Sequence, residues 1–236
     1  MAFQWFEFRE REDLNAELSA AIGAGLAQML ADAPIAGLVS AGGTTAPPVL
    51  KRIAAADLDW PRVWVTLSDE RWVPPLHAAS NEKMVRENLL RGRAGAAHFI
   101  PIYSDEESPE AAEAMCHERL AGMPWRSSLC LLGMGKDGHV ASLFPEAAAL
   151  GDALNPAFDR LCKAVRPISS EIAGPHPRMS LTLAALTRTR HIYLLITGEE
   201  KRATFDRARN GEAEREMPVR AILRQSSTPV GVYWAP

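Results

Sequence analysis

The apolar residues of this chain follow two spacings, one typical of helices and the other typical of buried strands. Between residues 12 and 31 they recur at helical spacing, which predicts a helix that covers a sheet. Short apolar runs predict strands buried on both faces, at residues 35–40, 63–67, 129–132, 192–196 and 230–234. Weaker patterns favour two further strands at residues 99–102 and 161–165.

Helix signals fall between these strands. Ser108, Pro109 and Glu110 combine a capping side chain, a proline at the first position and an acidic first turn, which predicts a helix to residue 120. Other helices are expected around residues 49–56, from the cap at Ser80 to residue 90, and after residue 198. Strands that alternate with helices favour an α/β fold, a three-layer, mainly parallel open sheet with helices on both faces. No linker interrupts the pattern, so we expect a single domain over residues 1–236.

The strand at residues 35–40 leads into a glycine loop, Gly42-Gly43-Thr44-Thr45, ahead of a helix. Successive backbone N–H groups, the helix dipole and two threonine hydroxyls favour a phosphate there. The loop is not a Walker A motif, because no G-K-[ST] follows, so we expect a phosphoester ligand and not ATP. A glycine-rich turn without a ligand is the structural alternative.

Charged residues appear abruptly where the strand at residues 63–67 ends. A solvated surface turn is one interpretation, and the other is that Asp69 and Arg71 reach the same crevice as the glycine loops. Asn81 lies beside the helix cap and could also face a ligand.

The strand at residues 129–132 breaks into glycines that carry Asp137 and His139 out of the sheet. A carboxylate and an imidazole so close on such a turn indicate acid–base chemistry. The same residues spell G-x-G-x-x-G, but a dinucleotide-binding fingerprint should open a helix, and here the chain runs into Pro145. A histidine packed under a loop is the structural alternative for His139.

Four strand ends therefore carry chemical features: the glycine loop, the charged run at Asp69, the turn of His139, and residues 198–201, which include Lys201. Ligands of parallel α/β sheets bind beyond the carboxyl ends of the strands. We therefore expect these four segments to meet in one crevice.

Composition limits the classes of partner. The chain is 47% hydrophobic and 23% charged, which excludes a largely disordered protein, and its net charge of −3 gives no general attraction to nucleic acid or membrane. The amino terminus lacks a basic leader before an apolar core, and no segment approaches a membrane span in length, so a cytoplasmic protein is expected. Cys116, Cys130 and Cys162 lack paired spacing and are expected to be reduced core residues.

The patterns of several enzyme classes are absent. The sequence contains no G-x-S-x-G nucleophile elbow, and its histidines and cysteines lack metal-binding spacing, so we expect no covalent serine intermediate, no metal and no cofactor. A histidine that acts as a general acid or base beside a carboxylate remains, with arginine and lysine for an anion.

These residues resemble the 6-phosphogluconolactonases, within the wider group of glucosamine-6-phosphate deaminases and ribose-5-phosphate isomerases. GMGKDGHVASLFP is close to the strongest signature of that family, and SDERWVPPLHAASN, PRMSLTLAAL and TGEEK match its other blocks in the right order over nearly the whole chain. Ala41 and Ala46 stand where the family usually has serine and proline, which affects only the detailed assignment of the phosphate loop.

The resemblance implies hydrolysis of 6-phospho-D-glucono-1,5-lactone in the oxidative pentose phosphate pathway, with the fold of that group. By this analogy His139 takes a proton from the attacking water and returns one to the departing ring oxygen, while Asp137 orients the imidazole. Arg71 and Arg178 are candidates for the oxyanion or the phosphate, and Lys201 with the glycine loop for the phosphate. The expected partner is a small phosphorylated sugar lactone, and the expected state is a monomer or a weak homo-oligomer.

Two alternatives stay open. The related deaminases follow the D-G-H turn with a catalytic glutamate, and the corresponding residue here is Phe144, which argues against amine chemistry. A sugar-phosphate sensor on the same fold would need an attached DNA-binding domain, for which a chain filled by one sheet leaves no room.

Overall fold

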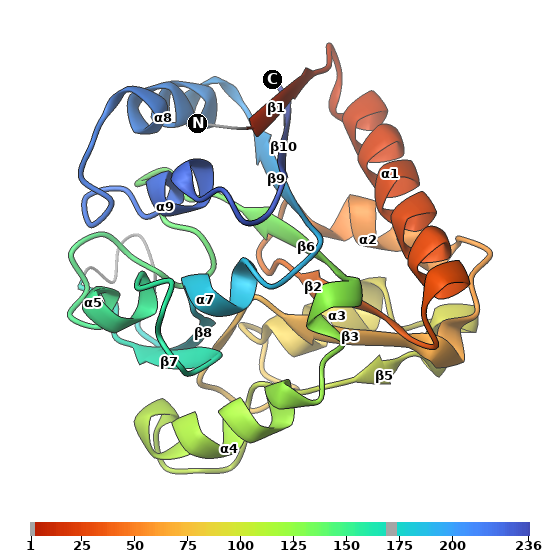
Figure 1. Cartoon of the computed structure of the whole chain (residues 1–236), viewed down its shortest axis with the longest axis horizontal. Helices are drawn as coiled ribbons and strands as arrows, with labels where there is room; N and C mark the ends of the chain where they lie inside the picture. Colours follow the sequence, from red (N-terminus) through yellow and green to blue (C-terminus); the bar gives the residue numbers. More distant parts are fainter. Residues whose placement is uncertain (1–2, 169–173) are drawn as a thin grey trace.

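The computed structural model describes residues 3–168 and 174–236. Its largest element is a seven-stranded sheet in the order β1-β10-β9-β6-β2-β3-β5, in which all neighbouring strands are parallel (Figure 1). The strands are β1 (Phe3–Glu7), β2 (Ala36–Ser40), β3 (Val63–Leu67), β5 (His98–Phe99), β6 (Ser128–Gly133), β9 (His191–Thr197) and β10 (Val230–Ala235).

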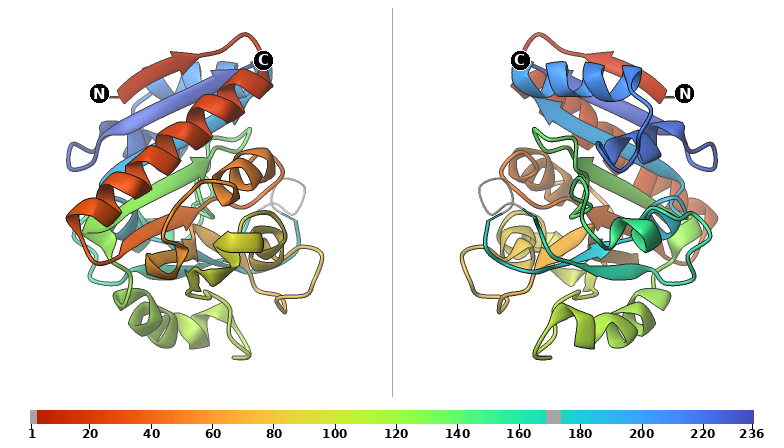
Figure 2. Two further views of the ribbon diagram at one scale, coloured as in Figure 1. Left: turned by 90° about the vertical axis from the view of Figure 1, so that its right-hand side faces the viewer. Right: turned by 90° about the vertical axis from the view of Figure 1, so that its left-hand side faces the viewer.

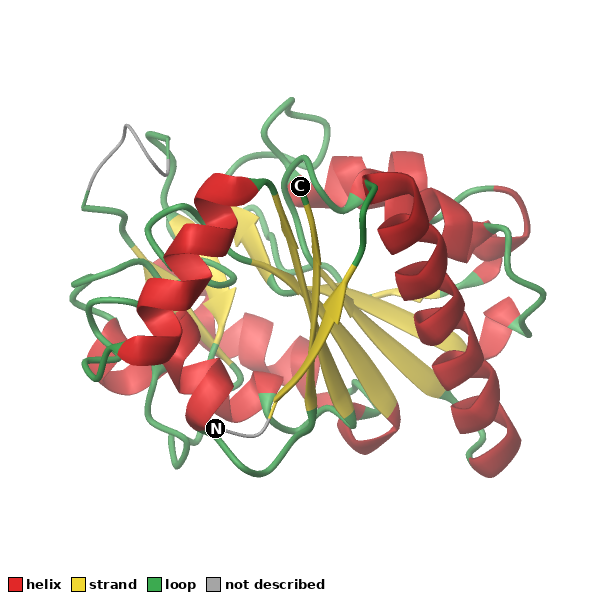
Figure 3. Ribbon diagram, turned by 90° about the horizontal axis from the view of Figure 1, so that it is seen from above, coloured by secondary structure: helices red, strands yellow, loops and turns green. Residues whose placement is uncertain are grey.

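Helices cover both faces of this sheet, as Figure 3 shows from above. Helices α1 and α2 lie over one face, and α8 and α9 over the other (Figure 2). The helices are α1 (Arg11–Asp32), α2 (Pro47–Ala54), α3 (Asn81–Asn88), α4 (Pro109–Ala121), α5 (Leu150–Ala153), α7 (Leu183–Leu186), α8 (Glu199–Asn210) and α9 (Val219–Arg224), with 3-10 turns at Trp60–Arg62, Gly92–Ala96 and Trp125–Ser127. The expected three-layer α/β fold is therefore confirmed.

Local sequence signals explain most of these elements. All five residues of β2 are buried, as expected of a central parallel strand. The inner face of α1 buries the leucines and isoleucine whose spacing predicted the helix. Ser80 caps α3 by accepting a hydrogen bond from Lys83 N at 3.2 Å, and Ser108 caps α4 by accepting one from Ala111 N at 3.3 Å.

A second, three-stranded antiparallel sheet packs beside the first, in the order β4 (Asp69–Arg71), β8 (Arg178–Leu181) and β7 (Cys162–Val165). The strand expected at residues 161–165 belongs to this sheet, whose existence the sequence pattern did not indicate. The reading of β4 as a solvated surface turn is wrong, because Asp69 is 7% exposed and Glu70 is completely buried. These carboxylates can be buried because neighbouring donors hydrogen-bond to them.

Two strands differ from expectation. β5 covers only His98–Phe99, and the chain beyond it runs on beside β3, where Ile100 N donates to Val65 O at 2.8 Å. β1 was not predicted, because its apolar residues are followed by a charged run; it pairs with β10, and Phe6 stacks on Tyr233 with ring centroids 4.6 Å apart. Among the described residues, no helix is both long enough and apolar enough to cross a membrane.

The order of the strands determines where the crevice lies. From β2 the chain continues to β3 on one side, and from β6 it continues to β9 on the other, so the connections diverge where β2 meets β6. Loops that leave the carboxyl ends of two such strands separate and leave a space between them.

Candidate active site

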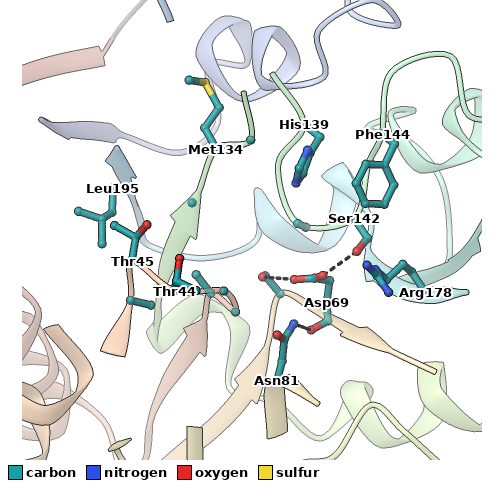
Figure 4. Close-up of a pocket in the computed structure, with 18 of the residues that line it drawn as sticks. Thr44, Thr45, Asp69, Asn81, Met134, His139, Ser142, Phe144, Arg178 and Leu195 are labelled. Carbon is teal, nitrogen blue, oxygen red and sulfur yellow. Dashed lines mark hydrogen bonds between the residues drawn. The ribbon is translucent and has the colours of Figure 1, made fainter. Parts of the chain in front are cut away.

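A cavity of about 580 Å³ opens above the carboxyl ends of β2, β6 and β9, beside the small sheet (Figure 4). Every residue expected at the site lines it except Asp137, and these residues are Gly42, Gly43, Thr44, Thr45, Asp69, Arg71, Asn81, His139, Arg178 and Lys201. The four segments that were expected to meet therefore lie around one space, although the part contributed by residues 198–201 is Lys201 alone.

The turn of His139 is a compact loop and not the start of a helix. Gly138 N donates to Gly135 O at 3.1 Å, Gly135 N donates to His139 O at 2.9 Å, and Met134 pairs with Val140 in an isolated bridge. Gly138 has φ +85°, which favours glycine, and a Cβ on Gly135 would lie 2.2 Å from the His139 ring. The next helix in the chain is α5, so the dinucleotide-binding fingerprint is not formed.

Asp137 holds the His139 ring from outside the cavity. His139 Nδ1 lies 2.6 Å from Asp137 Oδ1, which also accepts the His139 backbone N–H at 3.1 Å. Burial alone would raise the pKa of Asp137, but the hydrogen bonds and charge of His139 outweigh it and hold that pKa below its ordinary value. With Nδ1 engaged, Nε2 is the ring nitrogen left to exchange a proton in the cavity.

Phe144 packs against the other side of the imidazole, with ring centroids 4.6 Å apart. Phe144 is 6% exposed and lines the cavity beside His139 (Figure 4). The position at which the deaminase analogy requires a glutamate therefore presents an apolar ring.

Asp69 ties the loop of His139 to the small sheet. Its Oδ1 accepts from Ser68 Oγ at 3.0 Å, and its Oδ2 accepts from Ser142 Oγ at 2.6 Å. Ser142 is completely buried, and its N–H donates to Ser180 Oγ at 3.1 Å. Sequence reasoning did not single out Ser142, and its place in the family signature was the available signal.

Arg71 and Arg178 lie directly opposite each other in the antiparallel pair of β4 and β8. Arg178 is 4% exposed; burial, followed by the charge of Arg71, lowers its pKa to about 10, although Asp69 and Glu70 oppose this. Their side chains also donate to backbone carbonyls, Arg71 Nη1 to Ala79 O at 2.7 Å and Arg178 Nη1 to His176 O at 3.1 Å. Two facing guanidinium groups that line one cavity favour an anion between them.

Glu70 fixes the start of α3 under this part of the cavity. Its carboxylate accepts the backbone N–H groups of Arg71, Asn81 and Glu82, each at 2.7 Å, and the Ser80 hydroxyl at 3.0 Å. Burial raises the pKa of Glu70 to about 7, against these four hydrogen bonds, which lower it. Glu70 therefore sets the position of Arg71 and Asn81 without lining the cavity.

The glycine loop packs on Asn81. A Cβ on Gly42 would lie 2.2 Å from Asn81 Oδ1, and Gly43 has φ +78°, so both positions require glycine. Asn81 Nδ2 donates to Asp69 O at 2.8 Å, while its buried Oδ1 has no hydrogen-bond partner among the described residues.

The donors that this loop offers differ from those expected. Helix α2 begins with two prolines, Pro47 and Pro48, which have no backbone N–H. The start of the helix therefore lacks two of the donors that make a helix terminus attractive to anions. The groups that can donate hydrogen bonds to a ligand are therefore the loop N–H groups and the hydroxyls of Thr44 and Thr45, which line the cavity.

Lys201 lies in the first turn of α8. The pKa of Lys201 is lowered mainly by burial and further by the charges of Lys136 and Arg11. Lys136, from the turn of His139, also lines the cavity, and sequence reasoning did not identify it. Among the described residues no group of three or more histidine, cysteine or acidic side chains is placed to hold a metal ion.

Comparison with known proteins gives matches over nearly the whole chain. The family model described as glucosamine-6-phosphate isomerases/6-phosphogluconolactonase matches residues 9–233. The 6-phosphogluconolactonase of Caulobacter vibrioides is 44% identical over 97% of this chain and 95% of its own, and that of Mesorhizobium japonicum is 38% identical over 100% and 96%. The crystal structure of a 6-phosphogluconolactonase from Shewanella baltica has a TM-score of 0.94 at 35% identity and covers 99% of this chain and 98% of that one. The matched region contains every residue of the cavity.

Proposed function

The chain belongs to the glucosamine-6-phosphate isomerase/6-phosphogluconolactonase family, and we propose how its cavity performs the lactonase reaction. The protein is an enzyme of the oxidative pentose phosphate pathway that hydrolyses 6-phospho-D-glucono-1,5-lactone to 6-phospho-D-gluconate, as the relatives and structural neighbours at 35–44% identity indicate. What remains to be assigned is the role of each side chain.

His139 is the proposed general base. Asp137 binds Nδ1, so Nε2 takes a proton from a water molecule that attacks the lactone carbonyl. The resulting imidazolium, stabilised by the Asp137 carboxylate, returns a proton to the ring oxygen when the tetrahedral intermediate opens. The pairing of Asp137 with His139 at the edge of the cavity is the observation that carries this proposal. A δ-lactone is an activated ester, so a base and an oxyanion stabiliser suffice without a covalent intermediate.

The two ends of the cavity have different donors, which suggests how the substrate lies. Figure 4 shows Thr44 and Thr45 on the side of Leu195, and Arg178 on the opposite side beyond Asp69 and Ser142. We assign the phosphate to the glycine loop and Lys201. The pair of Arg71 and Arg178 then stabilises the oxyanion and later the product carboxylate.

Two polar residues between these ends position the site. Asn81 lines the cavity, but its Oδ1 is covered by Gly42 and its Nδ2 donates to Asp69 O, so we assign it to holding Asp69 and the glycine loop in place. Asp69 acts by holding Ser142 and the loop of His139 in place. Deaminase chemistry is not proposed, because Phe144 packs where a catalytic glutamate would be needed.

We further propose that residues 1–236 act as one lactonase domain in the cytoplasm, as a monomer or a weak homo-oligomer. All three cysteines are free and buried, which suits a reducing compartment. Among the described residues, Leu76 and Ile168 are the large hydrophobic side chains that are exposed, and two isolated residues do not make a stable interface. Sedimentation across a range of concentrations tests the oligomeric state, and cell fractionation tests the compartment.

The decisive experiment generates the lactone from glucose 6-phosphate with a dehydrogenase and follows its disappearance with and without the protein. Hydrolysis faster than the spontaneous rate is expected. A rate equal to the spontaneous one at any protein concentration would refute the lactonase assignment.

A further inference from the structure

A second lysine, Lys136, lies at the same end of the cavity as Lys201. Lys136 belongs to the turn that carries His139, and both lysines line the cavity. Lys136 Nζ forms an ion pair with Glu200 Oε2 at 2.6 Å, and Glu200 precedes Lys201 in the first turn of α8. Two ammonium groups from separate elements therefore lie near a single carboxylate.

Two lysine ammonium groups gather at this end of the cavity. Burial lowers the pKa of Lys201, the positive charges of Lys136 and Arg11 lower it further, and the charge of Glu200 raises it. Lys136 and Lys201 are the two lysines among the described residues that line the cavity. A phosphate monoester carries about 1.5 to 2 negative charges at pH 7, more than one lysine can neutralise.

We propose that Lys136 is a second phosphate-binding residue, which exchanges its ion pair with Glu200 for one with the C6 phosphate of the lactone. This inference rests on the proposed function, because it assigns a further residue to the phosphate end of the same cavity. Lys136 thereby helps the enzyme to distinguish phosphorylated from unphosphorylated lactones.

The anchoring of Lys136 suits such an exchange. Its backbone is fixed, because Lys136 O accepts a hydrogen bond from Thr204 Oγ1 at 3.0 Å. Its side chain is 66% exposed and that of Glu200 is 64% exposed, so both can change rotamer without disturbing the core. An ion pair this exposed is weak, and exchanging it for a contact with a phosphate dianion costs little.

Lys136→Met removes the charge and keeps a side chain of similar length. We expect kcat/KM for the phosphorylated lactone to fall about 10-fold, mainly through KM, because one charge-assisted contact is lost. The value for unphosphorylated glucono-1,5-lactone should not change. Glu200→Gln, which releases Lys136 from its partner, should lower KM for the phosphorylated lactone. Lys51→Met is the matched control, since it removes an exposed lysine of α2 that does not line the cavity.

Inorganic phosphate, used as a competitive inhibitor, gives a second readout, and its inhibition constant should rise in Lys136→Met by a factor similar to that in KM. Unchanged values for both lactones in Lys136→Met, an equal loss with both, or an unchanged or higher KM in Glu200→Gln would overturn the role of Lys136. The lactonase assignment itself fails only if the unmodified protein does not accelerate hydrolysis, and this outcome is separate from any difference between variants.

Discussion

At the scale of single residues, catalysis is expected to depend on the His139 imidazole. We expect His139→Ala to lower kcat by about 10²- to 10⁴-fold, because general-base assistance is lost while the oxyanion and phosphate contacts remain. The protein should still fold, with the melting temperature lowered only by the loss of the contacts of the ring with Asp137 and Phe144. His98→Ala, at an exposed histidine of β5, is the control. Near-normal kcat in His139→Ala would mean that the histidine is structural.

Asp137 belongs to the same scale, and its charge links stability to pH. The hydrogen bonds of His139 hold the pKa of Asp137 below its ordinary value despite burial, so the ionised carboxylate stabilises the folded state above the unfolded pKa of about 3.9. This contribution is lost as the pH falls through the lower, folded-state pKa. We therefore expect the difference in unfolding free energy between the unmodified protein and Asp137→Asn to shrink on going from neutral pH to about pH 3. Urea titrations at each pH measure it, and a constant difference would contradict the role of the charge.

At the scale of elements, the turn of His139 is held from behind by the two helices that follow β9. Thr204 of α8 donates to Lys136 O at 3.0 Å, and Val219 N of α9 donates to Gly138 O at 2.9 Å. The side chain of Met217 lies so close that a Cβ on Gly138 would be 2.8 Å from its Cε. Helices α8 and α9 therefore position a turn to which they are not adjacent in sequence.

We expect Thr204→Val, which keeps the shape but removes the hydroxyl that donates to Lys136 O and accepts from Arg207 Nη2 at 3.1 Å, to lower kcat several-fold with little change in KM, because the turn of His139 loses an anchor. Stability should fall by about 1 to 2 kcal/mol, because two hydrogen bonds of about 1 kcal/mol each are lost. Thr187→Val is the matched control, because its hydroxyl donates to Leu183 O at 2.8 Å, away from the cavity. If both variants lose stability and neither loses kcat, Thr204 has only a structural role.

At the scale of the whole molecule, the large sheet supplies one end of the cavity and the small sheet the other, so substrate recognition needs both. The unphosphorylated lactone should have a kcat/KM lower by about 10² or more, because two or more charge-assisted contacts of roughly 1.5 to 3 kcal/mol each are missing. Lys201→Ala should reduce this difference in kcat/KM, because it should lower kcat/KM for the phosphorylated lactone and leave the value for the unphosphorylated lactone unchanged. Kinetics with both lactones on both proteins measure the effect, and equal kcat/KM values on the unmodified protein would exclude a phosphate site.

The sequence by itself determined the elements and the local chemistry. Periodic burial encodes α1 and the buried strands, and Ser80 and Ser108 encode helix starts, because these signals act within a few residues. The contact of Asp137 with His139 could also be predicted from the sequence, because both residues belong to one glycine-rich turn. The meeting of loops above β2, β6 and β9 followed from the parallel topology.

Only the tertiary structure decided which residues from distant segments become neighbours at the cavity. Arg71 and Arg178 become neighbours through the pairing of β4 with β8, strands of three and four residues that are too short to give a recognisable burial period. Ser142 reaches Asp69, and Lys136 reaches the first turn of α8, through long-range packing. Hydrophobic periodicity indicates that a residue is buried but not which residues it packs against. Contacts between residues distant in sequence therefore depend on how the two sheets pack together.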